Sequence, residues 1–229
     1  MEKEWKRAMN YMWSNKAIRR SFGCGFELIG NGGMLLVMAV AMLVPLFAKM
    51  VEIHVSVSVC KWAYIVAFFC HMLMQVIVIE VPLTIYWVSG KGMGGAPFAK
   101  WLMTKGFVMN QLIYYVCGLV LMLGIHTINM AVGVLEVSWV DEILFLPGLF
   151  FLLEAVFQMA GSLLEREGTT RGYFGGTISA AVVALPTVMG RVRMSVGIAC
   201  LFQVLFLVVG VVLMYFSLLR RYKKRSGIR

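Results

Sequence analysis

The sequence predicts an all-α polytopic membrane protein with six transmembrane helices, an amphipathic N-terminal elbow helix and both termini in the cytoplasm. The first observation is the composition. The chain is 61% hydrophobic and only 14% charged, whereas soluble domains average ~45–50% apolar and ~25% charged residues. The apolar residues also gather in six windows of roughly the ~20 residues that a membrane-spanning helix needs. Finally, 17 of the 21 Lys and Arg residues fall on one side when these windows are threaded across a membrane.

The leader before the first window has the pattern of an interfacial helix. Its apolar residues fall at i, i+3, i+4, i+7 and i+8, on one helical face: Trp5, Ala8, Met9, Met12 and Trp13. Cations occupy the other faces, and a basic amphipathic helix with Trp on its apolar side lies in the headgroup region. We expect either a simple anchor or an elbow that turns into the bilayer at Gly23 and Gly25.

The six predicted spans take up most of the 229 residues. They cover 26–48, 62–88, 107–135, 143–164, 173–190 and 194–219. A long basic leader and five further apolar runs argue against a cleaved signal peptide. The predicted organisation is therefore an interfacial helix and turn at 1–22, one transmembrane domain at 23–219 and a basic tail at 220–229.

The cations fix the expected orientation. The leader and the tail carry six each, the connection between spans two and three carries Lys91, Lys100 and Lys105, and the connection between spans four and five carries Arg166 and Arg171. Only four cations fall on the other side. The positive-inside rule places the cation-rich side in the cytoplasm, and we expect a bacterial plasma membrane. The same asymmetry explains the net charge of +10 without a nucleic-acid partner.

The connection at 89–105 is the most distinctive cytoplasmic segment. Glycines precede Pro97, which suits the first turn of a helix, and Phe98, Trp101 and Leu102 then share one face. Such a helix, with Lys100 and Lys105 beside it, is a candidate for docking a partner protein. An interfacial turn, with a snorkelling lysine and an aromatic anchor, uses the same pattern and stays open.

Polar residues inside the spans are the candidates for a substrate path, because ionisable groups are costly in a membrane. They form stripes at helical spacing: Glu154, Gln158 and Ser162; Glu80 and Thr84; His71 and Gln75; Glu27 and Asn31. The alternative is interhelical hydrogen bonding with a purely structural role. We favour a functional role for Glu154 because of its central depth, and a structural or interfacial role for Glu80, Glu27 and His71.

No enzyme motif accompanies these residues, so we expect neither a catalytic residue nor a metal or cofactor site in this chain. There is no HExxH, no GxSxG and no Walker A sequence. The segment from Glu165 to Arg171 is similar to the EExxxR motif of CAAX-type intramembrane proteases. Its two glutamates are not adjacent, however, and no histidine follows them in the sequence. The presence of only three histidines argues against a bis-histidine haem bundle. Five scattered cysteines indicate no disulfide framework.

The layout resembles the permease subunits of exporter-type ABC transporters. The closest in size are short bacterial permeases of bacteriocin-immunity and antimicrobial-peptide exporters. The resemblance implies an elbow at 5–13, a coupling helix at 98–105 pressed against a soluble ATPase subunit that binds ATP, and a second permease copy or related permease. It departs from many relatives in its short outer segment before the last span, unless 173–190 is broken at Gly175, Gly176 or Pro186.

The expected function is that of a membrane permease subunit of an ATP-driven export complex, for a lipophilic or amphipathic substrate such as a peptide. Two alternatives stay open. One is an ATP-independent secondary transporter or channel with Glu154 as its ion or proton site. The other is a non-catalytic, substrate-binding membrane subunit.

Overall fold

The described part of the chain is a bundle of long helices without a β-strand. The computed structural model describes residues 32–53, 56–89, 100–164, 184–185, 187–188, 191 and 193–226. Its elements are α4 (Gly32–Met50), α5 (Val57–Ser89), the π-helix η2 (Leu102–Gly106), α7 (Phe107–Ala131), α8 (Val140–Leu164) and α10 (Val196–Ser226).

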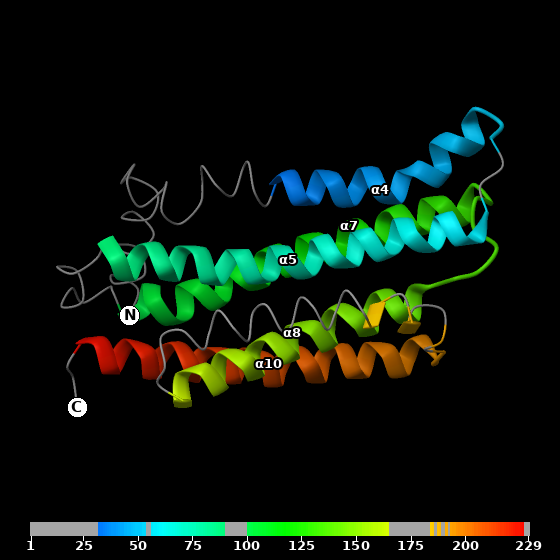
Figure 1. The fold of residues 1–229 in the computed structure, drawn as a ribbon. Coiled ribbons are helices and arrows are strands. Elements are labelled where there is room, and N and C mark those ends of the chain that lie inside the picture. Colours follow the sequence, from blue (N-terminus) through cyan, green and yellow to red (C-terminus); the bar gives the residue numbers. More distant parts are fainter. Residues whose placement is uncertain are drawn as a thin grey trace.

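From α4 to α8 the helices run alternately in opposite directions, whereas α8 and α10 run in the same direction (Figure 1). The turns between α4 and α5 and between α7 and α8, together with the start of α10, lie at one end of the bundle, which we call the loop end. The other end, where α5, α8 and α10 finish, is the tail end. The chain therefore alternates between the two ends from α4 to α8, and the predicted span that would return it from the end of α8 to the start of α10 lies almost entirely outside the described residues.

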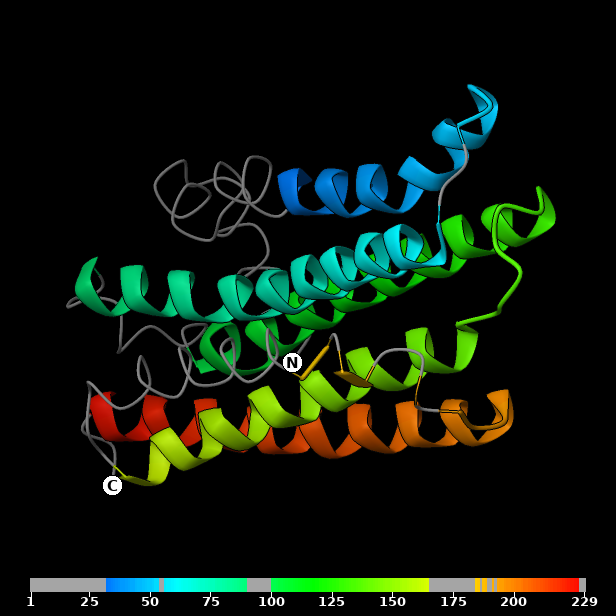
Figure 2. The same cartoon turned by 45° about the vertical axis from the view of Figure 1, so that its right-hand side comes forward.

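Two helix groups make up the bundle. α8 and α10 pack most extensively against each other, and we call them the helix pair. α4, α5 and α7 form the second body, the three-helix group. Figure 2 shows the two groups as separate layers, with α5 and α7 facing the helix pair. α5 and α7 both contact α8, so the interface between the groups is continuous.

Five of these helices are long and apolar enough to cross a membrane: α4, α5, the continuous segment Thr104–Ala131, α8 and α10. They match five of the six predicted windows, and the prediction of an all-helical chain is confirmed for the described residues. The fifth window, 173–190, and the leader helix lie almost entirely outside those residues. The predicted six spans, elbow and orientation thus stay predictions.

Several helix ends differ from the apolar windows, because capping rather than hydropathy decides them. α7 ends at Ala131, short of Leu135, where Gly133 adopts a left-handed φ of 70°. The Val134 amide then donates to Asn129 O at 2.8 Å and the Gly133 amide to Met130 O at 3.0 Å, which is a Schellman motif. Hydropathy alone gives no sign of this stop.

Other helices extend beyond the apolar windows predicted for them. α8 begins at Val140 with Asp141 and Glu142 in its first turn, where carboxylates interact favourably with the helix dipole. α10 continues to Ser226, so the first residues of the predicted tail are helical. The predicted docking helix at 98–105 is likewise not separate: from Lys100 onward the chain is helical and runs through η2 into α7.

The packed core lies inside the three-helix group and reaches the start of α8. It is rich in methionine and aromatic side chains, including Met38, Met42, Phe68 and Met122. α4 and α10 bury the least of their apolar windows, 17% each. Their outward faces are lined by Leu, Val and Phe, as expected for surfaces that face lipid. α4 also bends toward its end (Figure 1), where Pro45 removes one backbone donor.

Candidate functional site

Buried polar side chains gather on the inner faces of the helices and form four groups. The loop-end cluster consists of Tyr64, His126 and Asn129; the central cluster of His71, Tyr115 and Gln203; the amide pair of Gln75 and Gln111; and the helix-pair cluster of Glu154, Gln158 and Ser217. They occur in roughly this order from the loop end toward the tail end.

The loop-end cluster joins three helices to the α7–α8 loop. The Trp139 amide donates to His126 Nε2 at 3.3 Å, so the other ring nitrogen, Nδ1, carries the proton and donates to Tyr64 Oη at 2.9 Å. Asn129 Nδ2 donates to Met42 O at 2.9 Å and to Tyr64 Oη at 3.3 Å. Because these bonds tie α4, α5 and α7 together, the cluster is structural.

The central cluster bridges the two helix groups. His71 Nε2 donates to Tyr115 O at 3.1 Å, and the two rings meet edge to face with centroids 5.1 Å apart. The Tyr115 hydroxyl accepts a hydrogen bond from Gln203 Nε2 on α10, and its ring packs against Phe151 on α8 at 5.3 Å. Tyr115 is therefore the side chain through which α5, α7, α8 and α10 are connected.

A glycine makes room for the histidine. A Cβ at Gly118 on α7 would overlap the His71 ring and come within 3.2 Å of Met74 Cε. Glycine inside an apolar helix costs stability in water, but in membrane bundles small residues let neighbouring helices approach closely. Gly118 thus allows α5 and α7 to bury an imidazole between them.

The amide pair differs from the two clusters above because its side chains make no hydrogen bond to another described residue. Gln75 is 3% exposed and Gln111 is fully buried. None of their four amide nitrogen and oxygen atoms has a hydrogen-bond partner within the part of the chain that the structure describes. A buried polar group left unsatisfied costs about 1–3 kcal/mol. This pair therefore carries a cost in stability that the described residues do not offset.

The helix-pair cluster fastens α8 to α10. Gln158 Nε2 donates to Glu154 Oε1 at 2.9 Å within α8. The backbone carbonyl oxygen of Gln158 accepts a hydrogen bond from Ser217 Oγ at 2.8 Å and another from the Arg221 guanidinium at 3.4 Å. The Glu154 carboxylate is 4% exposed. A buried carboxylate thus lies in a polar region that ends at a cation on the tail side.

A cavity of about 330 Å³ opens at the loop end, between the α7–α8 loop and the start of α10. Trp139, Asp141, Glu142 and Arg193 line it. Asp141 Oδ2 accepts a hydrogen bond from the Met194 amide at 3.2 Å, so this carboxylate joins the two segments across the cavity. The cavity lies at the opposite end of the bundle from the cation-rich helix ends.

The structure places the predicted path residues as follows. Glu154, Gln158, Ser162, His71 and Gln75 are all buried. Ser162 Oγ donates to Met159 O in its own helix at 2.7 Å, which satisfies it locally. The side chains of Glu80 and Thr84, and Glu27 and Asn31, lie outside the described residues.

The predicted partner and interface residues are only partly visible. Lys100 and Lys105 are exposed and Trp101 is half-buried at the tail end. Pro97 and Phe98, the Leu102 side chain, and the leader residues Trp5, Met9, Met12 and Trp13 lie outside the described residues.

Sequence reasoning missed Gln111, Tyr115 and Gln203. Gln111 and Tyr115 are four residues apart in the third predicted span, the same spacing that marked His71 and Gln75. Applying the stripe criterion to every span therefore finds the first two. Gln203 is a single glutamine in an apolar run, and only the fold shows that it meets Tyr115.

Comparison with known proteins gave no match: no family model, no characterised protein and no solved structure is significantly similar to this chain. Among the described residues no group of three His, Cys, Asp or Glu side chains is placed to hold a metal ion. Function is therefore argued from the interior geometry and from the charge at the two ends.

Proposed function

We propose that this protein is the membrane permease subunit of an ATP-driven export complex in a bacterial plasma membrane. A separate subunit would hydrolyse ATP, and the substrate would be lipophilic or amphipathic, such as a peptide. The observation that carries the proposal is the set of buried polar side chains on the inner faces of α5, α7 and α10, with hydrogen-bonding capacity at Gln75, Gln111 and Gln203 that the described residues do not use. A bundle built only for stability gains nothing from unsatisfied amides in its centre.

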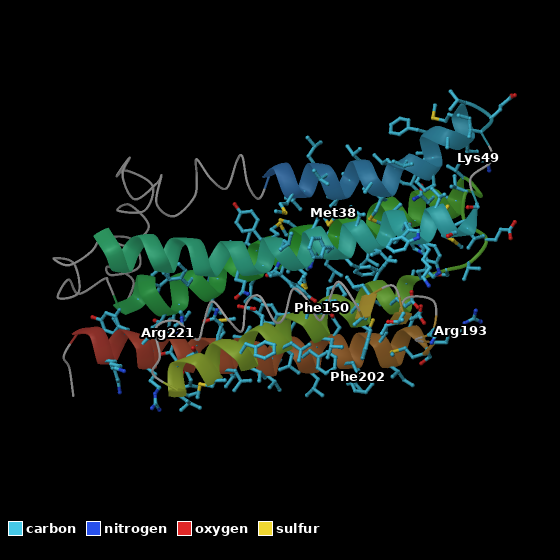
Figure 3. All side chains as sticks on the ribbon, viewed as in Figure 1. Met38, Lys49, Phe150, Arg193, Phe202 and Arg221 are labelled. Atoms are coloured by element: carbon cyan, nitrogen blue, oxygen red, sulfur yellow. The ribbon has the colours of Figure 1, made fainter. Side chains whose placement is uncertain are left out.

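The charges at the two ends support a cytoplasmic tail end. Exposed or half-exposed cations gather there: Lys100, Lys105, Arg220, Arg221, Lys223 and Lys224. The loop end combines four cations, Lys49, Lys61, Arg191 and Arg193, with the carboxylates of Glu52, Glu136, Asp141 and Glu142 (Figure 3 shows Lys49, Arg193 and Arg221). Positive-inside bias then directs the tail end toward the compartment that holds ATP.

The tail end also offers a surface for an ATPase subunit. The helical segment that starts at Lys100 contacts α10 through η2, so the described part of the predicted docking segment lies beside α10. A π-helical turn at Leu102–Gly106 interrupts the regular helix there, and such turns are frequent at functional positions. Movement of this surface would pass directly along α7 to Gln111 and Tyr115.

The test is purification of the tagged chain from its native membrane. We expect a stoichiometric partner with a Walker A sequence and ATP hydrolysis that orthovanadate inhibits. Charge reversal at Lys105, which is exposed, should weaken the association, whereas reversal at the loop-end residue Arg193 should not. A chain that purifies without an ATPase and shows no ATP hydrolysis contradicts the proposal.

A second candidate is an ATP-independent transporter. The observation that favours it is the buried Glu154 carboxylate and its hydrogen bond to Gln158, since intramembrane carboxylates often carry protons or ions. Flux in liposomes driven by an ion gradient alone, and lost in Glu154→Gln, would support this candidate and contradict the first.

A further inference from the structure

α10 lies at the edge of the bundle, where α8 is its main neighbour (Figure 1). Its inner face is buried and includes Arg221 at the tail end, whose guanidinium donates to Gln158 O on α8 at 3.4 Å. On the opposite face an exposed apolar series follows helical spacing, at i, i+4, i+7, i+11 and i+15. We call this series the α10 stripe, and its members are Leu201, Leu205, Val208, Val212 and Phe216.

The α10 stripe continues into cations without changing face. Arg220, Lys223 and Lys224 are exposed, and they follow Phe216 by four, seven and eight residues, the spacing of one helical face. α10 contains neither Asp nor Glu, so its own side chains do not neutralise this charge. The outward face of α10 therefore changes from apolar to cationic within about one helical turn.

The length of the exposed apolar face matches a lipid bilayer. This face runs from Val196, which is 51% exposed, to Phe216, which is 52% exposed. At a rise of 1.5 Å per residue the intervening helix is about 30 Å long, which is the thickness of the hydrocarbon core. Arg220 then lies about 6 Å beyond that core, and Lys223 and Lys224 about 10–12 Å beyond it. Because such side chains extend toward the headgroups, all three cations reach the layer that holds the lipid phosphates.

We propose that the outward face of α10 binds an anionic phospholipid, with its phosphate at Arg220, Lys223 and Lys224 and an acyl chain along the α10 stripe. Cation clusters directly after a membrane-spanning helix attract anionic lipids, whereas a zwitterionic lipid gains little from three like charges. The bound lipid covers the protein surface and is not its cargo. Binding needs neither ATP nor a partner subunit, so this site goes beyond the proposed function and is independent of it.

The first experiment measures lipid preference. The full chain, purified in detergent and freed of native lipid, is titrated with phosphatidylglycerol and with phosphatidylcholine of identical acyl chains, and bound lipid is counted by native mass spectrometry. We expect the wild type to bind phosphatidylglycerol at least tenfold more tightly. Neutralising the site with Arg220→Gln, Lys223→Gln and Lys224→Gln together should abolish this preference.

The matched control makes the same change in net charge at the loop end. It combines Lys61→Gln, Arg191→Gln and Arg193→Gln, which replace exposed or half-exposed cations, and it should keep the preference. Equal binding of the two lipids by the wild type, an unchanged preference in the variant neutralised on α10, or an equal loss in the control overturns the proposal.

Two further measurements use the wild type alone and so do not depend on how a variant folds. Raising ammonium acetate from about 0.1 M to about 1 M should reduce the preference at least fivefold, because salt screens exposed charges. Glycerol 3-phosphate at the concentration of the lipid should displace none of it, because it lacks the acyl chains that the α10 stripe contacts. A preference that salt does not change, or displacement by glycerol 3-phosphate, contradicts a lipid site of this kind.

Discussion

The bond between Tyr115 and Gln203 makes a quantitative prediction, because it joins the three-helix group to the helix pair. Tyr115→Phe keeps the ring and its contact with Phe151, and removes only the hydroxyl that accepts from Gln203 Nε2. Gln203 is 6% exposed and its Oε1 has no partner among the described residues. Tyr115→Phe therefore leaves the whole amide unsatisfied.

The magnitude follows from two limits. An orphaned buried polar group costs about 1–3 kcal/mol, whereas interhelical hydrogen bonds in membrane bundles average about 0.6 kcal/mol. We expect Tyr115→Phe to lower the free energy of unfolding by about 1–2 kcal/mol. Gln203→Leu should cost a similar amount, because it strands the buried tyrosine hydroxyl.

The double variant distinguishes a bond from two independent packing effects. With both partners apolar, nothing is left unsatisfied, so the two losses should not add and a coupling energy of about 1 kcal/mol should remain. Equilibrium unfolding in mixed micelles, followed by circular dichroism, measures all three variants. Strict additivity, or a Tyr115→Phe variant as stable as the wild type, would show that this bond does not connect the groups.

Three further predictions follow from the same bundle. Gly118→Ala should destabilise by about 1–3 kcal/mol because its methyl group meets the His71 ring, whereas Gly124→Ala, which meets nothing within 4 Å, should be neutral in the same thermal melts. Lys49→Met loses exposed bonds to the carbonyls of Val132 and Gly133 at 2.7 and 2.9 Å, so faster amide exchange at the end of α7 is expected with little change in global stability. Glu154→Gln should express normally yet change transport in reconstituted vesicles, and unchanged transport would assign this residue a structural role.

The sequence predicts the helices well because their apolar runs exceed the length that a membrane requires. Five of the six windows coincide with helices of the described chain. Their ends were less predictable. The stop of α7 depends on the left-handed turn at Gly133 and on bonds to Asn129 and Met130, which hydropathy does not measure.

The interior could be predicted only one helix at a time. Helical spacing correctly groups Glu154 with Gln158, because their bond lies within α8. It does not reveal that His71 reaches the Tyr115 carbonyl, or that Gln203 reaches the Tyr115 hydroxyl, because those pairs depend on the register of separate helices. His71 and Gln75 share a stripe yet differ in partners, since only His71 lies beside a carbonyl that it can reach.

The most direct test of the account is transport into inside-out vesicles that contain the protein and its co-purified partner. Export from a cell becomes uptake in this geometry, and a fluorescent capped apolar peptide serves as the substrate. The account predicts uptake that requires ATP and is inhibited by orthovanadate. Uptake driven by an ion gradient without ATP, or uptake that proceeds equally without this chain, would contradict it.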